Sequence, residues 1–221
     1  MNKHIALSLL DASPETVEKH LKSTDGFVSS IEGVFRPKNA QEVQNILRFA
    51  NEEKIKLWPI SSGRNFGYGT SQGSTPGAYY ILDLSLLKKI KYEGNGIVCI
   101  EAGVTQKDLY NFLRENNLSY LVPITGAGPD CSLIGNAIDG GYGQTPITDH
   151  FDAFLKFTGF WGSSEPMSVG FFSQAKGFND QLVPLEWQHG LGLNLKSTIR
   201  QAGLSVVTSG ILKLHPIQEG S

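Results

Sequence analysis

Apolar and polar residues alternate along this chain with two periods, one typical of strands and one typical of helices. Residues 34–37 predict a short strand that ends at its proline. A stripe at helical spacing follows, made of Val43, Ile46, Leu47 and Ala50. Asn39 precedes this stripe and Glu42 comes three residues later, which predicts a capping box. Because residues 54–60 predict the next strand, the segment indicates a β-strand–helix–β-strand (βαβ) unit with a right-handed crossover.

A second group of elements is predicted further along the chain. Residues 78–84 and 97–101 predict strands, and the turn at 94–96 indicates that they form a hairpin or meander. Residues 105–116 predict a helix whose inward face carries Leu109, Phe112 and Leu113. With the short strand at 120–122, we expect a second strand–helix–strand unit that ends at Pro123.

The first part of the chain predicts one helix. Ser13 supplies a capping hydroxyl and Pro14 occupies the first helical position, so a helix is expected from there to residues 25–26. Residues 1–10 are mostly apolar and predict an arm that packs on a neighbour.

Composition narrows the functional classes. The chain has 221 residues, enough for one large domain or two small ones, and its formal net charge of -2 comes without a basic stripe. Cys99 and Cys131 lie in unrelated contexts, which argues against a disulfide framework and a metal site. The apolar run at 5–10 is too short to cross a membrane. We therefore expect a soluble cytoplasmic protein with no nucleic-acid or membrane partner.

A glycine-rich loop follows the strand at 54–60. Glycines among small polar residues expose backbone N–H groups, which can curl into a nest for a phosphate or pyrophosphate. The alternative is a plain surface turn. The candidate ligand-binding residues of this loop are Ser61, Ser62, Gly63, Arg64, Asn65, Gly67 and Tyr68.

A second long loop spans residues 123–146 and is also rich in glycine. Long irregular loops inside compact domains are usually functional or disordered. Its apolar residues argue against disorder, so a functional loop is expected; they are Leu133, Ile134, Ala137 and Ile138.

Three segments together resemble the flavoprotein family of vanillyl-alcohol oxidase and p-cresol methylhydroxylase. Residues 59–69 (PISSGRNFGYG) are similar to its pyrophosphate loop. Residues 128–137 (GPDCSLIGNA), with GYGQTP at 141–146 and Asp-His-Phe at 149–151, are similar to its second flavin loop. Residues 190–208 resemble the segment that closes its FAD domain.

The resemblance implies an α+β fold in which two subdomains, with βαβ units and a mixed sheet, hold FAD between them. We expect an N-terminal arm and helix at 1–32 and the FAD-binding domain at 33–221, with subdomains at about 33–92 and 93–221. The family's cap domain, which carries much of the substrate pocket, is expected to be absent from this chain.

The resemblance also implies roles for individual residues. Besides the first loop, contacts to FAD are expected from Gly128, Pro129, Ser132, Gly135, Asn136, Gly140, Tyr142, Gly143 and Val207. Asp130 is the candidate catalytic base, with a plain loop-turning role as the alternative. His150 is expected to hydrogen-bond the loop. Asn65 stands where some relatives have a histidine bonded to the flavin, so we predict dissociable FAD.

Two functions remain open on the sequence alone. One is an FAD-dependent oxidoreductase that takes hydride from an alcohol, phenolic or amine substrate, with a partner subunit or homo-oligomer completing the site. The other is a flavin-binding subunit or regulatory module without turnover of its own. The flavin-dependent reductase of cell-wall precursor synthesis fits the loop residues less well. Residues 156–182, aromatic and broken by glycine, have no clear assignment; they could cover the flavin or contact another subunit.

Overall fold

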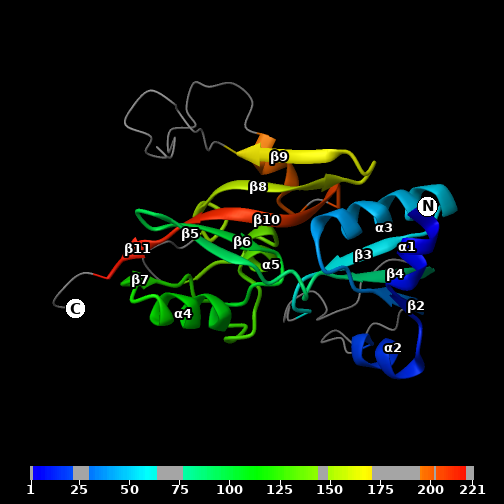
Figure 1. Cartoon of the computed structure of the whole chain (residues 1–221), viewed down its shortest axis with the longest axis horizontal. Coiled ribbons are helices and arrows are strands. Elements are labelled where there is room, and N and C mark those ends of the chain that lie inside the picture. Colours follow the sequence, from blue (N-terminus) through cyan, green and yellow to red (C-terminus); the bar gives the residue numbers. More distant parts are fainter. Residues whose placement is uncertain are drawn as a thin grey trace.

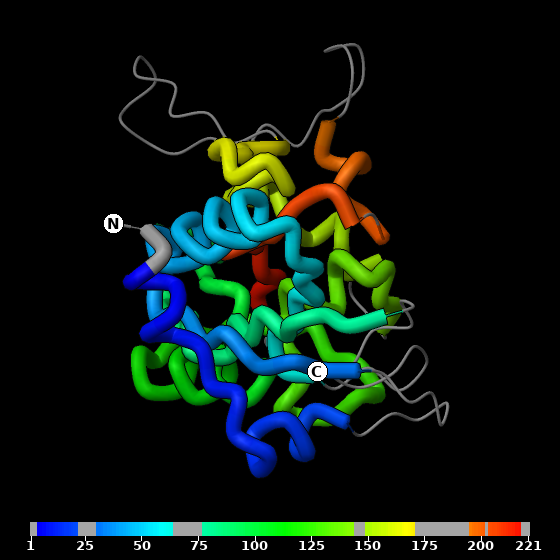
Figure 2. Tube along the Cα trace, turned by 90° about the vertical axis from the view of Figure 1, so that its right-hand side faces the viewer, coloured from blue at the N-terminus to red at the C-terminus, as the bar shows by residue number. Residues whose placement is uncertain are grey.

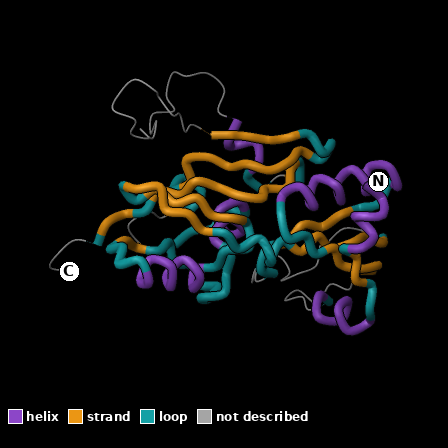
Figure 3. Tube along the Cα trace, viewed as in Figure 1, coloured by secondary structure: helices purple, strands orange, loops and turns teal. Residues whose placement is uncertain are grey.

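The computed structural model describes residues 2–21, 30–63, 77–143, 149–170, 195–201 and 203–217. Its described strands form two larger sheets that lie side by side, with helices packed around them (Figure 1). Figure 3 shows the strands gathered in these two groups with loops between them. The α+β architecture with mixed strand directions agrees with the fold expected from the sequence.

The first sheet has the strand order β1-β2-β4-β3. Its strands are β1 (Leu10–Asp11), β2 (Ser30–Phe35), β3 (Leu57–Ile60) and β4 (Ala78–Asp83). β2 and β3 each run parallel to β4, whereas β1 is antiparallel to β2. Because parallel strands point their carboxyl ends to the same edge, Arg36, Ser61 and Leu84 all leave the sheet on one side.

Helix α3 (Ala40–Glu53) connects β2 to β3, as the apolar stripe predicts. The Asn39 side chain accepts a hydrogen bond from the backbone N–H of Glu42 at 2.9 Å, so the predicted cap is confirmed. The Glu42 carboxylate instead accepts from the backbone N–H of Lys38 at 2.7 Å, one residue before the expected donor. The reciprocal capping box occurs in α4 (Gln106–Glu115), between Thr105 and Asp108.

The two faces of the first sheet are covered by different helices. α1 (Asn2–Ser8) and α3 lie over one face and α2 (Pro14–His20) lies over the other (Figure 1). The Ser13 cap of α2 is confirmed, since its side chain accepts from the Thr16 N–H. Residues 2–8, expected to belong to an arm, form α1, which packs on α3 of the same chain.

The second sheet has the order β5-β6-β10-β8-β9 and is antiparallel throughout. Its strands are β5 (Ile90–Gly94), β6 (Ile97–Glu101), β8 (Phe154–Trp161), β9 (Pro166–Gly170) and β10 (Ser205–Lys213). The turn at 94–96 is therefore confirmed, but the predicted partner strand is wrong. β5 pairs with β6, whereas residues 78–83 belong to the first sheet.

The segment that resisted assignment also contains regular structure. Residues 154–170 form the β8–β9 hairpin, and residues 171–182 lie outside the described ranges. Gly159 interrupts the apolar pattern because a Cβ there would lie 2.1 Å from the Val206 carbonyl oxygen. The prediction of a second strand–helix–strand unit is also wrong. β7 (Tyr120–Leu121) does not return to the sheet of β6 but pairs with β11 (His215–Pro216).

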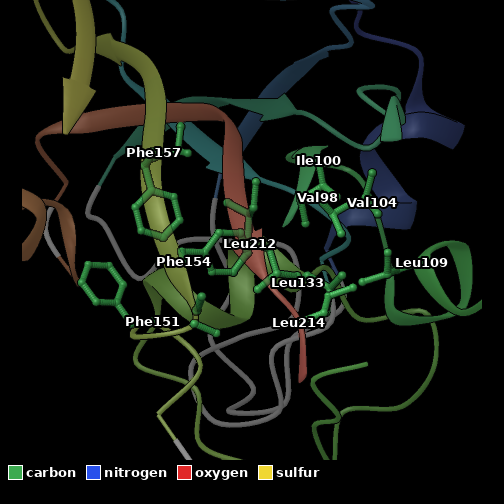
Figure 4. Packing of buried hydrophobic residues seen from close by; sticks show 14 of the residues in the cluster. Val98, Ile100, Val104, Leu109, Leu133, Phe151, Phe154, Phe157, Leu212 and Leu214 are labelled. Carbon is green, nitrogen blue, oxygen red and sulfur yellow. The ribbon is translucent and has the colours of Figure 1, made fainter. Parts of the chain in front are cut away.

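The larger apolar core lies beside the five-stranded sheet. Phe154 and Phe157 from β8 stack with ring centroids 4.9 Å apart, and α4 and α5 (Leu133–Ile138) supply aliphatic side chains to the same cluster (Figure 4). Leu133 and Phe151 both belong to this cluster. Their chain neighbours, Ser132 and His150, are therefore anchored by buried apolar contacts on one side.

Helix α3 connects the two halves of the molecule. In Figure 2 it lies between the N-terminal elements and the β8–β9 hairpin. Gln44 and Asn51 donate side-chain hydrogen bonds to the carbonyl oxygens of Ser164 and Gly162, at 3.1 and 2.9 Å. Val206 of β10 packs in the same apolar cluster as α3. These contacts fix the first sheet relative to the second.

Candidate functional site

The two glycine-rich loops of the sequence meet in space. The backbone N–H of Ser132 donates to the hydroxyl of Ser62 at 3.0 Å, across 70 positions of sequence. Ser62 is the second residue after β3, and Ser132 directly precedes α5. The meeting point therefore lies at the carboxyl edge of the parallel strands, where ligands gather in open α/β sheets.

Ser132 is fully buried and uses its polar groups within the protein. Its hydroxyl donates to the Ala102 carbonyl oxygen at 2.7 Å and accepts from the Gly135 N–H at 3.0 Å. The first bond ties the second loop to the end of β6, and the second caps α5. Ser132 thus joins three parts of the site, and its side chain has no spare donor for a ligand.

Gly135 allows the two loops to approach closely. A Cβ at this position would lie 2.3 Å from the Ser61 hydroxyl oxygen, which is shorter than any ordinary contact. Ser61, Ser62 and Gly63 are all half-buried at this junction. The absence of a side chain at 135 is therefore a geometric requirement of the site.

The turn before Ser132 carries the candidate base. The Cys131 N–H donates to the Gly128 carbonyl oxygen at 3.0 Å and closes a turn that contains Pro129 and Asp130. Pro129 and Asp130 are both exposed. Asp130 therefore lies on the protein surface, in the loop that is predicted to bind the cofactor.

The half-buried Asn136 and the buried His150 form the centre of the second loop. The His150 Nδ1 and the Asn136 Oδ1 are 2.6 Å apart. An amide oxygen only accepts, so Nδ1 carries the proton. His150 is 2% exposed, and its Nε2 has no hydrogen-bond partner within the described structure. Burial lowers the pKa of His150 below its usual value, although the Asp149 carboxylate opposes this effect.

The end of this loop folds back against His150. A Cβ at Gly143 would lie 2.2 Å from His150 Nε2 and 2.4 Å from the Ile124 carbonyl oxygen. Tyr142 forms a single antiparallel bridge with Asp149. Two large side chains of the loop point outward, since Tyr142 is 73% exposed and Ile124 is 64% exposed.

A charged cluster that the sequence did not reveal supports the same loop. Arg200 donates from Nη1 to the Asp149 carboxylate at 2.7 Å, and the Lys196 Nζ lies 4.6 Å from the centroid of the Phe151 ring. Lys196 is 2% exposed, and burial lowers its pKa to about 8. The residues come from segments about 50 positions apart, so no local pattern could have indicated them.

A second charged cluster lies at the carboxyl edge of the first sheet. The Asp83 carboxylate is 3.3 Å from Arg36 Nε and 3.9 Å from His20 Nε2. Burial opposes the charge on Asp83, but hydrogen bonds from His20 and Ser85 outweigh it and hold the Asp83 pKa below its usual value. The signal that could have found Asp83 is an acidic residue at the end of an apolar strand.

The structure brings together Ser61, Ser62, Gly63, Ser132, Gly135 and Asn136, and the same loop carries Gly128, Pro129, Asp130, Gly140, Tyr142 and Gly143. Arg64, Asn65, Gly67 and Tyr68 lie outside the described residues. Val207 lies within β10, and its side chain packs in the larger core. The contact with FAD that the resemblance implies for its backbone stays a prediction.

Two further observations concern the described ranges only. No three His, Cys, Asp or Glu side chains gather closely enough there to hold a metal ion. None of the helices in those ranges has the length and apolar character needed to cross a membrane.

Sequence comparison with known proteins identifies a family of FAD-binding domains. A family model described as an FAD binding domain matches residues 31–158. The chain is 29% identical over 188 residues to 1'-carboxy-chondrochloren decarboxylase of Chondromyces crocatus, which covers 84% of this chain and 34% of that protein. It is 40% identical over 114 residues to the 4-cresol dehydrogenase (hydroxylating) flavoprotein subunit of Pseudomonas putida, covering 50% of this chain and 22% of that subunit.

Solved structures show the same fold. The structure of p-cresol methylhydroxylase with substrate bound superposes with a TM-score of 0.83 at 23% identity, covering 99% of this chain and 42% of that one. The chain thus spans about a third or less of the length of these curated relatives.

Proposed function

Since this chain belongs to the family of FAD-binding domains, we propose that it holds FAD where the loop after β3 meets the loop that leads into α5. The observation that carries this proposal is the hydrogen bond between Ser62 and Ser132, because it places both glycine-rich loops at one strand edge. FAD is the cofactor of the family, and the residues at this junction fit it in two respects.

First, a ligand has access to the backbone of the second loop. Among the described residues, Cβ atoms added at Gly126 and Gly128 would meet no atom within 4 Å, so this part of the second loop presents bare main chain to a ligand. The second respect is charge. Backbone N–H groups of Ser61, Ser62 and Gly63 offer donors without a carboxylate among them, as a pyrophosphate requires. Asn136 and Gly143, held by His150, would line the flavin end of the site.

We propose that the protein works as an oxidoreductase on an alcohol, phenolic or amine substrate. FAD supplies the hydride-accepting centre. The chain's own residues bind it, keep Asn136 oriented and place Asp130 on the exposed turn beside the site, where its carboxylate accepts the substrate proton. The name of the Pseudomonas putida relative supports a phenolic substrate and a partner subunit.

The cofactor is proposed to be dissociable. Asn65 stands where a covalently linked histidine occurs in some relatives, and an amide cannot form that bond. Denaturing the FAD-loaded protein with acid should therefore leave the flavin in the supernatant. Flavin that precipitates with the chain would contradict the non-covalent assignment and leave the binding site itself intact.

The test of function uses the purified chain loaded with FAD under anaerobic conditions. A 4-alkylphenol, a primary alcohol and an amine are added separately. We expect a compound of one of these three classes to reduce the flavin, seen as loss of the absorbance of oxidised flavin. A colourless protein without affinity for FAD would contradict the cofactor site. Bound FAD that stays oxidised with every donor would contradict turnover by this chain alone and favour a flavin-binding subunit.

A further inference from the structure

We propose that His150 is a positioning residue for the cofactor site: its neutral imidazole fixes Asn136 through Nδ1 and supports Gly143 through Nε2. This inference rests on the proposed function, because Asn136 and Gly143 are two of the residues expected to contact FAD. His150 itself is 2% exposed and lies behind them.

Only one tautomer of the neutral His150 imidazole can form the hydrogen bond to Asn136. The 2.6 Å contact between Nδ1 and the Asn136 amide oxygen requires a proton on Nδ1, so the other ring nitrogen is a bare acceptor in the neutral ring. That nitrogen is buried and has no partner in the described structure. It faces the α-carbon of Gly143, where a Cβ would lie only 2.2 Å away.

A proton on Nε2 would disturb this arrangement. The new N–H would be buried against Gly143 with no hydrogen-bond acceptor in the described structure, and a buried unsatisfied donor costs about 1–3 kcal/mol. The charged groups around His150 are Asp149 beside it and, beyond Asp149, Arg200, which donates to the Asp149 carboxylate at 2.7 Å. Lys196 lies over the Phe151 ring that follows His150. Burial in this setting lowers the His150 pKa, which keeps the ring neutral at neutral pH.

The arrangement also explains why the loop closes on itself. Asn136 accepts the Gly141 N–H at its carbonyl oxygen at 2.7 Å, and the His150 N–H donates to the Gly141 carbonyl oxygen at 3.2 Å. The imidazole and these two backbone bonds therefore hold α5, Gly141 and Gly143 as one unit. If the imidazole loses its bond to Asn136, the amide can rotate away from its place in the site.

Three proteins test the proposal: wild type, His150→Asn and His150→Leu. Asparagine places an amide N–H near the position of Nδ1 and retains the bond to Asn136, whereas leucine fills similar space without a donor. FAD affinity, measured by equilibrium titration at pH 7.5, should fall roughly three- to tenfold in His150→Leu and change less than about threefold in His150→Asn. Circular dichroism confirms that each variant is folded.

The pH profile separates positioning from simple packing. Wild-type affinity for FAD should be constant near neutral pH and fall as the pH drops through the lowered imidazole pKa, because protonation disturbs Gly143. His150→Asn should lack this fall. Equal affinity in wild type and His150→Leu, or the same pH profile in wild type and His150→Asn, would overturn the proposal while leaving FAD binding by the wild type established.

A second readout needs no FAD. Hydrogen exchange of the cofactor-free proteins should be faster in peptides covering residues 133–143 of His150→Leu than in those of wild type. Unchanged exchange there would overturn the positioning role even if the wild type failed to bind FAD. A wild type that fails to bind FAD contradicts the proposed function, so the two failures are distinguishable.

Discussion

Among single residues, the site depends on small polar side chains and backbone groups that form several hydrogen bonds each. From one buried position, the N–H and hydroxyl of Ser132 form hydrogen bonds to Ser62, Ala102 and Gly135. Each bond fixes a different segment, which is why the residue joins the two loops. Net hydrogen bonds contribute about 0.5–1.5 kcal/mol each, so the junction is held by a sum of modest terms.

Substitution of Ser62 by alanine removes the acceptor for the Ser132 N–H. We expect FAD affinity to fall roughly three- to tenfold and unfolding free energy to fall by about 1 kcal/mol, since a half-buried donor loses its partner. Isothermal titration and urea denaturation measure the two effects. Ser197→Ala, at an exposed position of the 3-10 helix Leu195–Ile199, is the matched control and should change neither. Wild-type affinity in Ser62→Ala would show that the junction does not support the site.

Among the helices and strands, the sequence predicted the features that depend on nearby residues and missed those that depend on distant ones. The caps at Ser13 and Asn39 and the apolar stripe of α3 are encoded within a few residues, so the sequence predicted them. The β8–β9 hairpin was missed because its aromatic residues face a core built from distant segments, and Gly159 disguises the strand. The partner of β7 was equally beyond local patterns.

Gly159 gives a direct test of this packing. Alanine at this position would bring its Cβ to 2.1 Å from the Val206 carbonyl oxygen and 2.9 Å from the Val207 α-carbon, both backbone atoms that cannot rotate away. We expect a loss of roughly 1–3 kcal/mol in unfolding free energy, as for an overpacked core. Gly203→Ala is the control, since no atom of the described residues lies within 4 Å of its Cβ position. Equal stability of the two variants would contradict the β8–β10 register.

The attachment of α2 to the first sheet should depend on pH. A hydrogen bond to the Asp83 carboxylate raises the pKa of His20, while burial and, to a smaller extent, Arg36 oppose this. The Asp11 carboxylate near Arg36 stays charged, because hydrogen bonds from Ser13 lower its pKa to about 2. A raised pKa stabilises the folded state fully below the unfolded value of about 6.5, and this contribution is lost as pH rises through the folded pKa. The difference in unfolding free energy between wild type and His20→Asn should therefore be larger at pH 6 than at pH 8. A difference that is constant with pH, measured by urea denaturation, would contradict the pair.

At the scale of the whole molecule, two sheets are fixed by α3 so that loops distant in sequence meet at one strand edge. Glycine spacing and strand ends are visible in a single chain, so they predicted both loops. The FAD-binding fold was predicted from the resemblance of three segments to the flavoprotein family. The sequence also predicted that His150 hydrogen-bonds the second loop, which the contact with Asn136 confirms, but it indicated neither this partner nor the pair of Asp149 and Arg200. Asn136 and His150 are 14 positions apart, and Asp149 and Arg200 are 51 apart, so each contact depends on the completed fold.

We propose above all that these two loops together hold FAD. Hydrogen–deuterium exchange of the wild-type chain with and without saturating FAD tests it directly, because it reports which backbone amides the cofactor protects. We expect protection in peptides covering residues 60–63 and 128–143, with little change in β9 at Pro166–Gly170. Bound FAD that protects neither loop, or protects only one, would contradict the account.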